Sequence, residues 1–83
     1  MNRDIDQEIL FHMTHSIGES AEPEMLRRVV HGCTRTITEI RDACIRLQRG
    51  GDISRVRFKD GATGRVVVFF RLTEKGRTKG NEK

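Results

Sequence analysis

The chain has 83 residues, of which 35% are hydrophobic and 34% charged, so we expect a single domain with a small core. Sixteen Lys and Arg against 12 Asp and Glu leave a formal net charge of +4, which favours a polyanionic partner. The sequence contains no apolar run long enough to span a membrane and no basic-then-apolar leader, so we expect a soluble, cytoplasmic protein.

The charge is unevenly distributed along the chain. From Arg55 to Lys83 there are nine Lys or Arg and three acidic residues, whereas the first 24 residues hold six acids and one arginine, Arg3. Such a division suits a protein that turns one end towards phosphate. The absence of Trp and Tyr argues against recognition of single-stranded bases by stacking.

The first half of the chain shows two helical patterns. Residues from Asp4 to about His15 predict a helix, because apolar residues recur at helical spacing. Residues 16–22 are interpreted as a loop, and Pro23 suits the first position of a second helix that Gly32 ends. The expected buried positions are Ile5, Ile9, Leu10, Met13 and Ile17 in the first helix, and Met25, Leu26, Val29 and Val30 in the second.

A third helix is the best-specified element of the sequence. Thr36 and Glu39 fit a capping box, in which each side chain satisfies a backbone N–H of the first turn. An apolar stripe follows at i, i+3 and i+4 spacing, and Gly50-Gly51 stops the helix. The stripe consists of Ile37, Ile40, Ala43, Cys44 and Leu47, and Ile53 is expected to close over the core.

The next segment predicts a β-hairpin. Val56 and Phe58 alternate with basic residues, as in a half-buried strand. The turn-forming run 60–64 begins with Asp-Gly, and residues 65–72 form the returning strand, in which one of Phe69 and Phe70 must face away from the core. Residues 77–83 have the composition of a disordered basic tail.

This order of helix, helix, helix and hairpin resembles the winged helix-turn-helix proteins of bacterial and phage transcription control. The resemblance runs from about Asp4 to Gly76. It is carried by the stripe of the third helix, by Gly51-Asp52-Ile53, by the basic hairpin and by Arg71-Leu72-Thr73-Glu74-Lys75-Gly76. It implies an α+β winged helix-turn-helix domain over residues 1–76, with three helices followed by a two-stranded antiparallel wing. The segment between Gly32 and Ile40 departs from the family, because it is about two residues longer than the usual turn.

The resemblance further implies a transcriptional regulator that binds double-stranded DNA, without a cofactor and as a homodimer, in a bacterium, phage or plasmid. Its third helix would enter the major groove, and its wing would contact the backbone or the minor groove. The candidate DNA-binding residues are Arg27, Arg28, Arg35, Thr36, Thr38, Arg41, Asp42, Arg57, Lys59 and Arg65. The alternatives are a solvated helix face held by ion pairs, and basic residues that protect an edge strand from pairing.

Other functions have weaker support in the sequence. His12, His15, His31 and Cys33 lack the paired spacing of a structural metal site, so we expect no bound metal. Residues 61–64 form a turn without the lysine of a phosphate-binding loop, and so small a domain offers little space for an active site, so we expect no enzyme. The rival hypothesis is a protein-interaction module without DNA binding, with a dimer or partner surface on Ile5, Leu10, Phe11 and Ile17 or on an exposed Phe.

Overall fold

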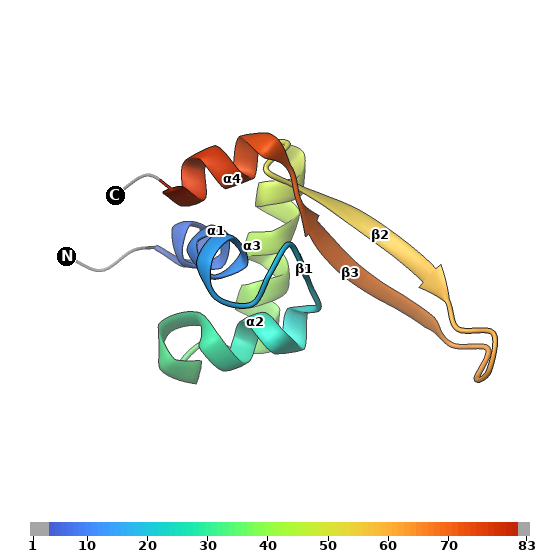
Figure 1. Ribbon diagram of the computed structural model, residues 1–83. Helices are drawn as coiled ribbons and strands as arrows, with labels where there is room; N and C mark the ends of the chain where they lie inside the picture. Colours follow the sequence, from blue (N-terminus) through green and yellow to red (C-terminus); the bar gives the residue numbers. More distant parts are fainter. Residues whose placement is uncertain (1–3, 82–83) are drawn as a thin grey trace.

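A computed structural model of the protein describes residues 4–81 and has an α+β fold. Within these residues there are four α-helices and one antiparallel sheet of three strands, in the order β1–β3–β2. The elements are α1 (Ile5–His15), β1 (Ser20–Ala21), α2 (Pro23–Val29), a 3-10 turn η1 (Val30–Cys33), α3 (Ile37–Arg49), β2 (Ile53–Lys59), β3 (Val66–Leu72) and α4 (Glu74–Asn81). The β2–β3 hairpin projects from the body formed by the helices (Figure 1). The α+β class is therefore confirmed, whereas the expected layout lacked β1 and α4.

Helices α1 and α3 begin where the sequence predicts. The Asp4 side chain caps α1 by accepting a hydrogen bond from the backbone N–H of Gln7, at 2.8 Å. Both hydrogen bonds of the Thr36–Glu39 capping box are present at the start of α3. Helix α3 ends at Arg49, and Gly51 then adopts a φ of 80°, a conformation that glycine adopts without steric cost.

Helix α2 is shorter than predicted. It ends at Val29 rather than at Gly32, and η1 leads into the connection to α3. His31, Gly32 and Cys33 all have positive φ values, of 50°, 65° and 69°. Three successive left-handed residues cannot continue a right-handed helix, which explains both the early end of α2 and the long connection that follows.

The core lies where the helices meet the base of the sheet. Its largest fully buried side chains are Ile9, Met13, Leu26, Val30, Ile40, Cys44 and Ile53. Burial raises the pKa of the Cys44 thiol to about 12, so this cysteine is a small apolar core residue. Two expected core positions are wrong: Met25 is 41% exposed and Phe58 is 55% exposed. Phe58 stands on the part of the hairpin that extends beyond the helices.

Strand β1 interrupts the predicted loop of residues 16–22. Ser20 pairs with Arg71 and Ala21 with Phe70, so β1 adds a third strand to the base of the hairpin. The Glu19 carbonyl oxygen also accepts a hydrogen bond from the N–H of Leu72. Two residues are too few to produce an alternating pattern, so this strand left no signal in the sequence.

Helix α4 replaces most of the predicted disordered tail. It extends to Asn81, while residues 82 and 83 lie outside the described part of the chain. Among its described residues, the buried ones are the glycines Gly76 and Gly80. A Cβ atom on Gly80 would lie 2.8 Å from the Leu10 carbonyl oxygen and would overlap the Thr14 hydroxyl. Helix α4 therefore packs on α1 by close backbone approach rather than through apolar side chains.

Polar contacts hold α4 in place. Lys79 reaches the buried carboxylate of Asp52 at 3.1 Å, and Arg77 pairs with Glu19. The Thr73 hydroxyl donates to backbone oxygens at the junction between α3 and β2, including that of Gly51, at 2.7 Å. The composition of this segment predicts disorder. The prediction fails because specific polar contacts of this kind leave no periodic pattern in the sequence.

Candidate nucleic-acid interface

The β2–β3 hairpin carries its positive charge on one face. In the register of the two strands, Arg55 stands opposite Phe70, Arg57 opposite Val68 and Lys59 opposite Val66. Side chains alternate between the faces of a strand, and directly opposed residues share a face. The three cations therefore project from the face whose base, formed by Phe70 with Ile53 and Leu72, covers the core.

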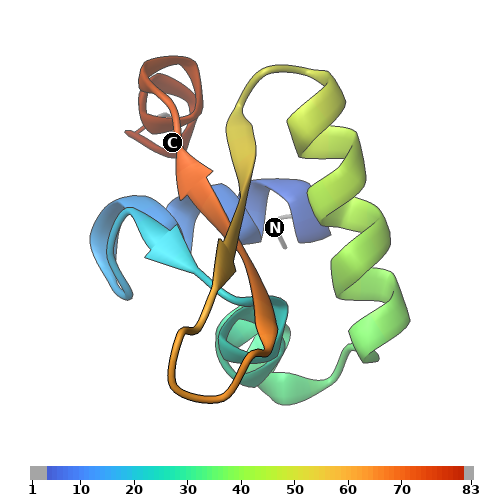
Figure 2. The same cartoon turned by 90° about the vertical axis from the view of Figure 1, so that its right-hand side faces the viewer.

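These cations are available to an external partner. Arg55, Arg57 and Lys59 are all exposed, and no described carboxylate forms an ion pair with any of them. Figure 2 looks along the hairpin from its tip and shows α3 on one side of the hairpin and α2 beneath it. The extended hairpin accounts for much of the longest dimension of the molecule, 44 Å against 27 and 22 Å in the other directions.

Helix α3 presents a polar surface opposite its buried stripe. Thr38, Arg41 and Asp42 are exposed, as predicted, and Ile45 is 44% exposed on the next turn. This surface mixes a cation, an anion, a hydroxyl and an apolar group. Such a mixture can distinguish base edges, whereas a uniform row of lysines would bind phosphate without regard to sequence.

Two of the predicted DNA-binding arginines form hydrogen bonds and ion pairs with other side chains of the protein. Arg27 Nε donates to Glu24 Oε2 at 3.1 Å, and this hydrogen bond, together with the charge of Glu24, raises the pKa of the guanidinium. Arg35 Nε donates to His31 Nδ1 at 3.1 Å, and Arg35 Nη1 lies 3.4 Å from Glu39 Oε2. Arg35 is also only partly exposed. Both side chains brace the connection between α2 and α3, whereas Arg28 is exposed.

The hydrogen bonds of Thr36 are likewise made within the protein, in the capping box. Its hydroxyl accepts from the backbone N–H of Glu39 at 3.2 Å, while Glu39 Oε1 accepts from the backbone N–H of Thr36 at 3.2 Å. The second of these bonds is the main reason that the pKa of the Glu39 carboxyl is lowered, and the Thr36 hydroxyl and Arg35 add to it. The two side chains set the first turn of α3 and so orient Thr38 and Arg41.

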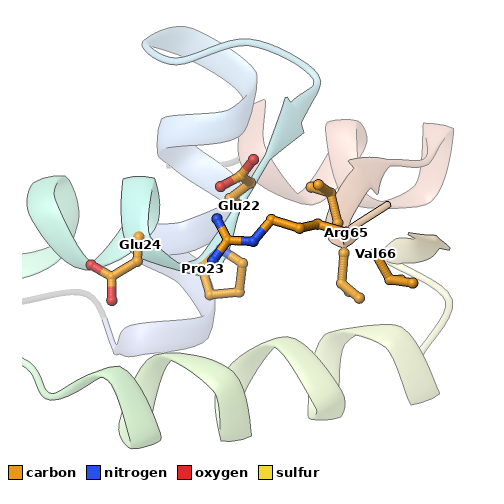
Figure 3. A pocket seen from close by; sticks show the side chains of 7 residues that line it. Glu22, Pro23, Glu24, Arg65 and Val66 are labelled. Carbon is orange, nitrogen blue, oxygen red and sulfur yellow. The ribbon is translucent and has the colours of Figure 1, made fainter. Parts of the chain in front are cut away.

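Arg65 lies apart from the other cations of the hairpin. A shallow cleft separates the start of α2 from the outer half of β3 and is lined by Glu22, Pro23, Glu24, Arg65, Val66, Val67 and Val68. The Arg65 side chain extends across this cleft towards Pro23 and Glu22 (Figure 3). Its guanidinium therefore lies beside the start of α2, near Pro23 and Glu22, rather than with the cations of β2.

Sequence reasoning missed Arg55 as a candidate. Arg55 shares its exposed face with Arg57 and Lys59, and its i, i+2 spacing to Arg57 was a visible signal. Reasoning from the hairpin tip favoured Arg65 instead, because the tip is where a wing is expected to meet DNA. The observed basic face thus comprises Arg55, Arg57 and Lys59.

The histidines and the cysteine that were considered as metal ligands make other contacts. His12 Nε2 lies 3.1 Å from Glu8 Oε1, His15 Nε2 lies 3.2 Å from the Gly80 carbonyl oxygen, and Cys33 Sγ accepts from Arg27 at 3.6 Å. Residues 4–81 contain no cluster of three or more side chains arranged to hold a metal ion. Over the same residues, no helix has the length and apolar character needed to cross a membrane.

Comparison of the chain with protein-family models, with curated proteins and with solved structures finds no significant match.

Proposed function

We propose that the protein is a winged helix-turn-helix regulator of transcription that binds double-stranded DNA. In this proposal, α2, η1 and α3 form the helix-turn-helix and the β2–β3 hairpin is the wing. The exposed side of α3 enters the major groove, and the wing follows the adjacent backbone or minor groove. Strand β1 widens the base of the wing, and α4 is an addition to the three-helix core.

The observation that carries the proposal is the basic face of the hairpin. Arg55, Arg57 and Lys59 occupy alternate positions of β2, so their charges repeat at about 7 Å. Negative charge repeats along each strand of a duplex at a spacing of the same order. A ribbon with this spacing can track one strand of a duplex, and each neutralised phosphate releases counterions.

The exposure of the predicted residues and their contacts within the protein assign them different roles. Arg57, Lys59 and Arg28 act on phosphate, while Thr38, Arg41 and Asp42 face the bases. Arg27, Arg35 and Thr36 act indirectly, because their contacts with Glu24, His31 and Glu39 hold the start of α3 in place. Arg65 contacts DNA only if it leaves the cleft beside Glu22.

The test is fluorescence anisotropy with random-sequence duplexes at low and physiological salt, at protein concentrations in the nanomolar to low micromolar range. We expect binding that weakens as salt increases, with a slope that reports the number of phosphates contacted. Single-stranded DNA of the same length is the control, and the absence of Trp and Tyr predicts weaker binding to it. Absence of duplex binding at low salt would overturn the proposal.

A second function, a protein-interaction module without DNA binding, has one specific observation in its favour. Phe58 is a large apolar side chain that is 55% exposed on the hairpin. The surface expected on α1 is weaker, because Leu10 is buried and Phe11 packs against His12 and His15. If duplex binding is absent while the chain associates with itself or another protein, the second function holds.

A further inference from the structure

Ile45 is a large apolar side chain that α3 presents to solvent. It is 44% exposed, whereas the apolar stripe on the other side of the helix is buried. A β-branched residue stabilises an exposed helix position less than alanine or a long polar residue does, so helix formation does not explain Ile45. Single exposed apolar residues are common on protein surfaces, so the position of Ile45 carries more information than its exposure.

Ile45 lies at the centre of the exposed face of α3. Thr38, Asp42 and Ile45 follow one another at i, i+4 and i+7 and so form a row along the side opposite the buried stripe. Arg41 borders this row on one side, and Arg46 borders it on the other, where an ion pair with α1 holds it. Helix α3 forms one side of the molecule, and all three residues of the row are exposed (Figure 2). A partner that approaches this side of α3 therefore meets Ile45 with Arg41 and Asp42 one turn away.

The chemistry of this row suits the edges of bases better than phosphate. Its side chains offer a hydroxyl, a carboxylate and an aliphatic group, and no cation stands among them. The Asp42 carboxylate would repel a phosphate, and the Ile45 side chain has no group that could bind one. In the major groove the base edges carry hydrogen-bonding groups and one methyl group, at C5 of thymine. That methyl group is the feature that an aliphatic side chain can distinguish.

We infer that Ile45 contacts the C5-methyl group of a thymine and makes thymine a fixed part of the DNA sequence that the protein prefers. This inference rests on the proposed function, because it requires α3 to lie in the major groove. Along the helix axis Ile45 lies about 6 Å beyond Arg41, and successive bases of one strand are about 3.4 Å apart. The thymine is therefore expected within about two base pairs of the pair that Arg41 contacts.

The first experiment is selection from a random duplex pool with the wild type and three variants. Ile45→Ala removes most of the aliphatic side chain and favours the helix, while Ile45→Val keeps a β-branched apolar group. Phe58→Ala is the control, because it removes an exposed apolar side chain from the face of the hairpin opposite its cations. We expect the wild type, Ile45→Val and Phe58→Ala to enrich thymine at one position. Ile45→Ala should lose that enrichment and retain the preference at other positions, which also shows that this variant is folded.

The second experiment removes the methyl group from the DNA. In the duplex selected by the wild type, deoxyuridine replaces thymidine at that position, which deletes the C5-methyl group and leaves the base pair unchanged. We expect wild-type affinity, measured by fluorescence anisotropy, to fall roughly threefold to tenfold. Ile45→Ala should bind the two duplexes equally, because this variant has already lost the contact. An equal loss in both proteins would attribute the thymine preference to DNA shape rather than to Ile45, and would overturn the inference.

The outcomes separate this inference from the proposed function. Duplex binding with a base preference that Ile45→Ala leaves unchanged overturns the inference and leaves DNA binding in place. Duplex binding without any base preference does the same, since phosphate contacts alone would account for it. Absence of duplex binding at low salt overturns the proposed function, and the inference fails with it.

Discussion

Arg41 is an exposed cation in the first half of α3, and neither it nor Arg49 at the end of the helix forms an ion pair with a described carboxylate. If it reads a base, Arg41→Ala should weaken binding to a preferred sequence by about 1–3 kcal/mol and relax the preference at one position. Arg46→Ala is the comparison, because Arg46 Nη2 is held by Asp6 Oδ1 at 2.8 Å and should lose less. Selection from a random duplex pool measures the base preference, and an unchanged preference would show that Arg41 does not contact a base.

Arg57 stands in the middle of the basic face of β2. Arg57→Ala should weaken all duplexes to a similar extent and reduce the salt slope by about one, because one phosphate contact is lost. Arg71→Ala removes the same charge from the opposite face of the sheet and serves as the control. If the two variants lose affinity equally, overall charge rather than the basic face governs binding.

Several candidate residues could not be assigned from sequence alone. Arg27 and Arg28 are neighbours with the same chemistry, yet Arg27 is paired with Glu24 while Arg28 is exposed. Arg35 has a similar position beside the third helix, but it contacts His31 and Glu39. The spacing of charged residues predicts which side of a regular helix is exposed. The partners of these arginines depend instead on the left-handed turn at residues 31–33, which the sequence does not specify.

At the level of the helix, the start of α3 should be sensitive to pH. The lowered pKa of Glu39 means that its ionised form is favoured in the folded state. Its contribution to stability is therefore present above the ordinary value of about 4.5 and is lost as pH falls through the lowered pKa. The destabilisation caused by Glu39→Gln should be largest near neutral pH and should shrink in acid.

Chemical denaturation of both proteins between neutral and acidic pH measures this difference. Asp42→Asn removes one negative charge from the same helix and controls for the change in net charge. A difference between wild type and Glu39→Gln that stays constant down to the most acidic condition would show that the capping hydrogen bonds do not depend on the carboxylate charge.

Helix α4 should be sensitive to a single added carbon. Gly80→Ala brings a Cβ atom against the Leu10 carbonyl oxygen and the Thr14 hydroxyl, and nearby backbone cannot give way as a flexible side chain would. We expect a loss of about 1–3 kcal/mol in unfolding free energy and faster hydrogen exchange in α4. Gly61→Ala adds a methyl group where no atom lies within 4 Å and is the control. Unchanged exchange in α4 would contradict close packing on α1.

Some helices and strands are specified by residues close together in the sequence, and others are not. Helices α1 and α3 and the hairpin could be predicted, because their caps, stripes and turn residues act within a few positions of one another. Strand β1 and helix α4 could not, since Ser20–Ala21 is too short for a period and α4 buries glycines rather than apolar side chains. Both are stabilised by groups distant in sequence, such as Asp52 for Lys79 and Arg71 for Ser20.

For the molecule as a whole, the two faces of the hairpin are its most informative feature. Alternation in β2 predicted that one side is basic and the other apolar, but it assigned Val56 and Phe58 to the core. The core in fact takes the side of the cations at the base of the sheet, through Ile53, Phe70 and Leu72. The length of the strands beyond the core, which local sequence does not encode, leaves Phe58 exposed and Val56, Val67 and Phe69 only partly buried.

The pairing of β1 with β3 has a consequence for the order in which the chain folds. Ser20 and Arg71 are roughly fifty residues apart in sequence, and closing so long a loop is entropically more costly than forming a hairpin. Helix α3 and the β2–β3 hairpin need only neighbouring residues and can form early, whereas β1 must wait until both ends of that loop meet. The sheet would then be completed late, and the segment between α1 and α2 would be among the last to become ordered and the first to be released on unfolding.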